Sequence, residues 1–189
     1  MAEVYAHLRG AEVPEAGWHR WRQERDLLFR HHPCSPLPEI ARRPDHGLRY
    51  FNYDPAYRFL VEVEPIEGTA ETIDLGADGS FRAAPVARTR GLAGALRREL
   101  TLFWILGYGG GLFLPFSDAT SGQASYGGGR YLLDTIKGAD LGTLSGRLIL
   151  DFNFSYNPSC AYDPRWICPL APPENSTIVS VSAGEQTPI

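Results

Sequence analysis

The chain has 189 residues, 12% aromatic residues, 20 glycines and 15 prolines, which suits one domain and favours strands over a helical bundle. Its net charge of -4, without a basic run interleaved with aromatic residues, argues against nucleic acid as a partner. No apolar run approaches the length needed to cross a bilayer and the N-terminus lacks a secretory pattern, so we expect a cytoplasmic protein without a membrane partner.

The first residues differ in pattern from those that follow. Residues 1–16 show no sustained periodicity and are predicted to be a flexible arm, which leaves residues 17–189 as a single β-rich domain. From residue 17 to residue 32, Trp18, Trp21, Leu28 and Phe29 fall close to one helical face. We therefore expect one N-terminal amphipathic helix that covers a sheet or closes one end of a barrel. A proline-rich connector follows it.

The rest of the chain is predicted to form short strands. Alternation is clearest in residues 57–64, where apolar side chains share one face. Further candidates are residues 48–53, 71–74, 80–87, 99–106, 112–116, 130–134, 147–155 and 176–181. Roughly eight or nine strands with one flanking helix predict a mainly β fold, a single antiparallel β-barrel or a barrel-like sandwich, because closure removes exposed edges.

Polar residues alternate with apolar ones near the end of the predicted strand 147–155. Period-two geometry puts Asp151, Asn153 and Ser155 on the face opposite Leu148 and Leu150. That polar face either meets solvent or lines a cavity. The polar residues that follow would need partners if buried, which favours a cavity; these are Tyr156, Asn157, Cys160 and Tyr162.

A second polar group surrounds Arg130. Asp118, Ser121 and Tyr126 precede a triglycine, and Arg130 follows it. The planar guanidinium of arginine suits a carboxylate or a phosphate, so Arg130 could anchor an anionic substrate or pair with Asp118 or Asp151. A structural pair is the favoured interpretation.

Cys160 and Cys168 lie in a loop rich in prolines, whereas Cys34 is expected to stay a free thiol. A local disulfide, a metal pair and a thiol nucleophile at Cys160 are three interpretations. Zinc needs about four ligands, and the histidines form no matching cluster, so no metal is predicted. A nucleophile needs a base, and no histidine lies nearby in sequence. Inert packing or a redox pair is therefore favoured.

Long strings in the second half of the chain resemble a known family. The strings DATSGQASYGGGRYLLD and LDFNFSYNPSCAYDPRWICPLAPPEN, with a terminal AGE, resemble the bacterial family called domain of unknown function 1684. A weaker likeness extends to residues 21–26 and 47–51. The resemblance implies no particular reaction, cofactor or substrate. The positions that match are Asp118, Ser121, Gly122, Tyr126, Gly129, Arg130, Asp151, Asn153, Tyr156, Asn157, Cys160, Tyr162, Cys168 and Asn175.

These observations lead to one functional hypothesis. We expect a β-barrel that binds a small polar or anionic metabolite, and we favour an enzyme that uses acid–base chemistry. Asp118 or Asp151 would move a proton, with Cys160 as a further catalytic candidate. The residues that would hold the substrate are Ser121, Tyr126, Arg130, Asn153, Tyr156, Asn157 and Tyr162.

Two other functions are left open. One is a non-catalytic ligand-binding module in which the same residues form a structural network. The other is a flavin-binding barrel, which rests on analogy of fold alone. No cofactor is predicted, and a homodimer is left open.

Overall fold

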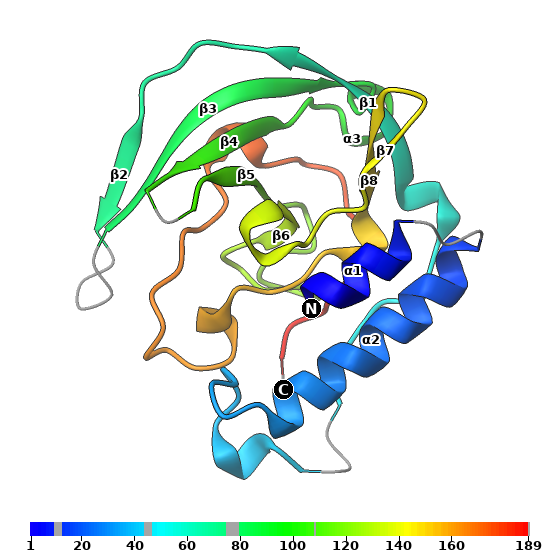
Figure 1. Ribbon diagram of the computed structural model, residues 1–189, viewed down its shortest axis with the longest axis vertical. Coiled ribbons are helices and arrows are strands. Elements are labelled where there is room, and N and C mark those ends of the chain that lie inside the picture. The colour runs from blue at the N-terminus through cyan, green and yellow to red at the C-terminus, as the bar shows by residue number, and fades with distance from the viewer. Residues whose placement is uncertain (10–12, 44–46, 75–79, 108, 189) are drawn as a thin grey trace.

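The structure is a computed structural model that describes residues 1–9, 13–43, 47–74, 80–107 and 109–188. One curled sheet dominates it, with two helices packed on one side (Figure 1). The helices are α1 (Ala2–Leu8), α2 (Pro14–His31) and the short α3 (Ala93–Leu96). The strands are β1 (Arg58–Pro65), β2 (Glu71–Asp74), β3 (Ser80–Arg90), β4 (Thr101–Leu106), β5 (Gly111–Phe116), β6 (Arg130–Asp134), β7 (Thr143–Leu144) and β8 (Arg147–Asp151).

The sheet has the strand order β6-β5-β4-β3-β1-β8-β7, and β2 pairs with β3 outside this path. All pairs are antiparallel, and the sheet curls into a half-barrel (Figure 1). Beyond β8, Tyr156 exchanges two backbone hydrogen bonds of 2.8 and 3.0 Å with Tyr131 of β6. This bridge links the two sides of the curl. The prediction of a mainly β, antiparallel, barrel-like fold is confirmed.

Three predicted strands differ from the observed ones. The strand predicted for residues 147–155 ends at Asp151, because the Asp151 carboxylate accepts a hydrogen bond of 3.0 Å from the backbone N–H of Asn153 and starts a 3₁₀ turn. The alternation predicted beyond Asp151 is therefore wrong. Residues 48–53 and 176–181 form isolated bridges rather than strands.

The N-terminal region contains more helical structure than the sequence predicted. The amphipathic helix is confirmed as α2, which buries Trp18, Trp21 and Phe29. The expectation of a flexible arm needs correction over residues 2–8, which form α1 with Tyr5 and Leu8 buried. A helix of two turns is too short to give a visible periodicity, and packing against α2 stabilises it.

The interior contains two hydrophobic clusters. One lies under β1, β4, β5 and β8 and includes Leu102, Leu114 and Phe152. The other lies beneath the helices and is mainly aromatic, with Tyr5, Trp18, Trp21, Phe113, Tyr131, Phe154 and Tyr156. The segment 181–185 runs through the interior of the curl, and Val181, Ala183 and Glu185 have no exposed surface.

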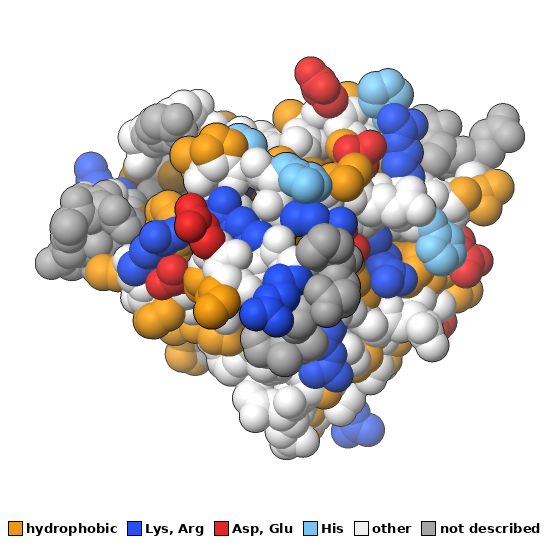
Figure 2. Space-filling view, turned by 90° about the horizontal axis from the view of Figure 1, so that it is seen from below, with side chains coloured by type: hydrophobic (Ala, Val, Ile, Leu, Met, Phe, Trp, Pro, Cys, Tyr) orange, Lys and Arg blue, Asp and Glu red, His pale blue; other side chains and the backbone are white. Residues whose placement is uncertain are grey.

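The outer surface near the end of α2 is charged. Figure 2 shows Lys and Arg side chains near the centre of the face seen from below, with histidine and acidic side chains around them. Such a mixed face is typical of a solvated surface. In the part of the chain that the structure describes, no helix is long and apolar enough to cross a membrane.

Candidate functional site

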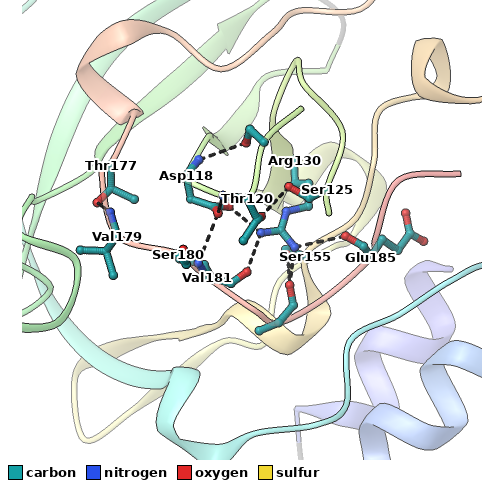
Figure 3. Close-up of polar contacts among 12 residues, drawn as sticks. Asp118, Thr120, Ser125, Arg130, Ser155, Thr177, Val179, Ser180, Val181 and Glu185 are labelled. Carbon is teal, nitrogen blue, oxygen red and sulfur yellow. Dashed lines mark hydrogen bonds and ion pairs between the residues drawn. The ribbon is translucent and has the colours of Figure 1, made fainter. Parts of the chain in front are cut away.

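Asp118 and Arg130 form a buried ion pair. Arg130 is 1% exposed, and its Nη2 lies 2.6 Å from the Asp118 Oδ2. The guanidinium also donates to the carbonyls of Val181, Ala183 and Glu185 (Figure 3). Burial lowers the pKa of Arg130, and the Asp118 carboxylate opposes that shift. Because both side chains are buried and their charges are paired, the pair holds the fold and is not open to a substrate.

The rest of this network fixes the loop before β6. Asp118 Oδ1 accepts hydrogen bonds from the backbone N–H groups of Thr120 and Val181, at 2.7 and 3.2 Å. The Ser121 hydroxyl accepts one from the backbone N–H of Asp118 at 3.1 Å. Gly129 has a φ of +85°, and a Cβ there would lie 2.5 Å from the Phe116 carbonyl oxygen. The motif residues of this loop therefore have structural explanations.

A second buried pair joins the segment 181–185 to α2. Glu185 Oε1 lies 2.7 Å from Nε and 2.6 Å from Nη2 of Arg25. Glu185 Oε2 accepts from the backbone N–H of Asn157 at 2.7 Å and from the Tyr162 hydroxyl at 2.6 Å. Burial raises the pKa of Tyr162 well above its usual value. Tyr162 is thus a donor to a structural carboxylate.

Sequence reasoning missed Arg25 and Glu185 as buried residues. A signal for Arg25 is its spacing, because it lies four residues from both Trp21 and Phe29 and so on their helical face. Its guanidinium lies over the rings of Trp21, Phe29 and Tyr156. A signal for Glu185 is the terminal AGE string, in which Gly184 has a φ of +78° and packs against the backbone of residues 152 and 155.

Asp151 and Asn153 form a third, separate group near the start of α2. The Asn153 side-chain amide donates to Asp151 Oδ1 and to the Asp54 carbonyl, both at 2.8 Å, and the backbone carbonyl of Asn153 accepts from the Trp18 indole. Asp151 is 1% exposed, and the nearest cation is Arg58, whose Nε lies 3.7 Å away. Burial raises the pKa of Asp151 to about 6. The group lies beside a small cavity of about 40 Å³.

A larger cavity of about 760 Å³ lies between the inner face of the sheet, the C-terminal half of α2 and the loop after β8. Exposed residues such as His32, Cys34 and Ile167 contribute to its lining, so the cavity reaches solvent. Its apolar lining includes Leu28, Phe29, Phe81, Ile105, Phe113, Ile136, Ile167 and Pro169. Its polar lining includes Arg25, Tyr131, Asp134, Lys137, Tyr156, Asn157 and Cys168.

One polar atom of this lining lacks a partner. Asn157 is 4% exposed, and its Oδ1 accepts no hydrogen bond from any residue that the structure describes. Its Nδ2 donates to the Gln186 carbonyl at 2.8 Å, which fixes the orientation of the amide. The charges are balanced, because Glu185 neutralises Arg25 and Asp134 lies 3.1 Å from the Lys137 amine. The cavity thus has largely apolar walls, and its lining includes the Asn157 amide, whose Oδ1 has no described partner and almost no accessible surface.

Two half-buried thiols lie beside the cavity. The Cys160 Sγ is 3.5 Å from the Tyr126 hydroxyl, and the Cys160 backbone N–H donates to the Cys168 Sγ at 3.4 Å. Burial raises the pKa of Cys168 to about 11 and that of Tyr126 to about 12. All three cysteines, including the exposed Cys34, are free thiols.

Residues 46–186 match the family model described as Protein of unknown function (DUF1684). The chain belongs to this family. The DUF1684 chain is also similar to the solution NMR structure of an uncharacterized protein from Haloarcula marismortui, with 36% sequence identity and a TM-score of 0.61. That match covers 92% of this chain and 94% of the archaeal one. No curated protein matches the chain.

The fold distributes the predicted site residues of this DUF1684 protein among separate places. Asp118, Ser121 and Arg130 form one network, and Asp151 with Asn153 forms another. The pairing favoured for Arg130 is confirmed, with Asp118 as the partner. Two predicted residues line the large cavity, namely Tyr156 and Asn157, whereas Cys160 contacts the lining residue Cys168 and Tyr126 contacts Cys160.

Proposed function

We propose that this protein binds a small, largely apolar molecule that carries a hydrogen-bond donor. The observation that carries the proposal is a cavity of about 760 Å³ with largely apolar walls, whose lining includes the buried Asn157 amide with no described partner at its Oδ1. Most ligand pockets have volumes of about 300–1,000 Å³, with apolar walls and a few placed polar groups. This cavity has those properties.

The walls favour an apolar body for the ligand. Aromatic rings from α2, β3 and β5 and aliphatic side chains from β4 and the loop after β8 face the same space. Burial of apolar surface stabilises a complex by about 25 cal/mol per Å² before the losses of association are subtracted. A molecule without an apolar body would leave this surface unused.

The polar lining of the cavity favours a ligand whose hydrogen-bond donor is neutral. A buried acceptor without a partner destabilises a protein by about 1–3 kcal/mol, and a ligand hydroxyl or N–H group would remove that loss once a small side-chain movement opens Asn157 Oδ1 to the cavity. The cations of Arg25 and Lys137 already have carboxylate partners. The ligand therefore needs no net charge, which favours the polar over the anionic alternative of the metabolite expected from the sequence.

The proposal is one of binding, because the acid–base residues expected from the sequence lie elsewhere. Asp118 and Arg130 are enclosed in their own network, and Asp151 lies beside a different, small cavity. An acid–base reaction stays a prediction, and the geometry that supports binding does not include these residues.

Calorimetric titration with matched ligand pairs tests the proposal. Neutral aromatic or aliphatic alcohols would be compared with their methyl ethers, which keep the apolar body and lack the donor. We expect each alcohol to bind about tenfold more tightly than its ether, since one hydrogen bond contributes about 1–1.5 kcal/mol. Equal affinities across the pairs would remove Asn157 from the proposal.

A matched pair of variants tests the place of binding. Ile167 lines the cavity and is 48% exposed, so Ile167→Trp should fill part of the space and weaken binding without unfolding the protein. Ile178 is 82% exposed and away from the described lining, and Ile178→Trp is the control. If both variants bind like the wild type, the ligand does not use this cavity.

A further inference from the structure

The thiols of Cys160 and Cys168 are close enough to act together. The backbone N–H of Cys160 donates to the Cys168 sulfur at 3.4 Å. Both residues are half-buried, and both are free thiols. The network of buried charges does not use them, and the proposed ligand site uses only the surface of Cys168.

We propose that Cys160 and Cys168 form a redox site that a low-molecular-weight disulfide converts reversibly into an intramolecular disulfide. The Cys160 thiolate attacks one sulfur of the small disulfide, which forms a mixed disulfide and releases one small thiolate. The Cys168 sulfur then attacks the Cys160 sulfur and releases the second small thiolate. The two protons of the protein thiols leave on the two small thiols, so two electrons pass from the protein to the small disulfide.

The surroundings of the two sulfurs give them different roles. Burial raises the pKa of Cys168 to about 11, which makes this thiol a poor first attacker. Tyr126 lies 3.5 Å from the Cys160 sulfur, and burial raises the pKa of this tyrosine to about 12, so its hydroxyl stays protonated. A thiolate can only accept a hydrogen bond, and the Tyr126 hydroxyl is placed to donate it. Cys160 is therefore the attacking residue, and Tyr126 is its positioning residue.

The disulfide would act on the wall of the cavity. Ile167, Cys168 and Pro169 all belong to the lining. A disulfide holds its two sulfurs at about 2.05 Å, so it would fix this stretch of the wall to Cys160. The consequence for ligand affinity rests on the proposed function, whereas the disulfide itself does not.

The experiment treats the full-length Cys34→Ser protein with oxidised glutathione and follows it by intact mass and peptide mapping. Removing Cys34 eliminates the exposed competing thiol. We expect loss of the mass of two hydrogen atoms, no free thiol and one peptide cross-link between Cys160 and Cys168, all reversed by dithiothreitol. In Cys34→Ser/Cys168→Ser we expect a stable glutathione adduct on Cys160, and in Cys34→Ser/Cys160→Ser much slower modification.

Two readouts separate this redox site from simple packing. In the Cys34→Ser/Cys168→Ser background, Tyr126→Phe should slow the attachment of glutathione to Cys160 without lowering the melting temperature, which loss of a merely structural tyrosine would not do. Peptide mapping of the oxidised wild-type protein also tests for the cross-link between Cys160 and Cys168, without any substitution. Two separate glutathione adducts, or two unmodified thiols, would overturn the proposal. Alcohol binding to the reduced protein tests the proposed function alone, so the two failures can be told apart.

Discussion

Two regions of this protein contain buried polar side chains, and they differ in whether those side chains have hydrogen-bonding or charged partners. Around the segment 181–185, Arg25, Asp118, Arg130 and Glu185 are paired with one another and with backbone carbonyls. In the cavity, Asn157 presents an acceptor that no described residue satisfies. The buried charges are typical of structure, and the free neutral acceptor is typical of a binding site. Charge alone is therefore a poor guide to function here.

The largest expected effect falls in the paired region. Arg130→Met leaves Asp118 buried without its cation, and we expect the free energy of unfolding to fall by about 3–5 kcal/mol in urea denaturation. Arg9→Met is the control, since Arg9 pairs with Asp140 at the surface and its loss should matter by less than about 1 kcal/mol. Similar losses for the two variants would contradict a special role for the buried pair.

The next largest expected effect is a dependence of the free energy of unfolding on pH. The folded protein holds a proton on Asp151 up to about pH 6, whereas the unfolded chain releases it near pH 4. The contribution of Asp151 to the free energy of unfolding therefore falls by up to about 3 kcal/mol as pH rises from 4 to 6. This contribution stays at the lower value above pH 6. Asp151→Asn keeps an acceptor for the backbone N–H of Asn153 and removes this dependence.

Denaturation of both proteins between pH 4 and pH 7.5 measures that contribution. Asp151→Asn should gain stability relative to the wild type as pH rises, and the difference should become constant above about pH 7. Parallel curves for the two proteins would mean that Arg58 compensates the buried charge and that the pKa is not raised.

The smallest expected effect tests whether Tyr162 belongs to the paired region or to the cavity. Tyr162→Phe removes the hydroxyl that donates to Glu185 at 2.6 Å but keeps the edge contact with Phe29. We expect a loss of about 2 kcal/mol in stability, and no change in alcohol affinity. Tyr57→Phe is the control, because its hydroxyl makes an exposed bond of 3.4 Å to the Ser180 carbonyl. A larger loss in affinity than in stability would assign Tyr162 to the binding region.

The sequence predicted the fold class because alternation survives wherever strands pair with strands. The prediction of strands failed where hydrogen bonds between side chains and the backbone replaced the hydrogen bonds between strands. Asp151 stops β8 by capping a 3₁₀ turn, and the segment 176–181 alternates like a strand although Arg130 takes the Val181 carbonyl. Competition for backbone hydrogen bonds, whether from a side chain two residues away or from a distant one, leaves no trace in local periodicity.

The candidate site was predictable only in part. Tyr156 and Asn157 were expected to need partners, and they reach the cavity. The favoured pairing of Arg130 was also predictable, because an arginine close in sequence to an aspartate suggests it. The cavity itself was not, because it is a gap between α2, the sheet and the loop after β8, and no local pattern records how far apart such segments pack.

The segment 181–185 has a consequence for the synthesis of the protein. Three charged side chains, those of Arg25, Asp118 and Arg130, take their partners from it, and all three leave the ribosome earlier. Until residues 181–185 emerge, Asp118 and Arg130 have only each other as charged partners, and Arg25 lacks the Glu185 carboxylate. We therefore expect the sheet to stay incompletely packed until this segment has been synthesised.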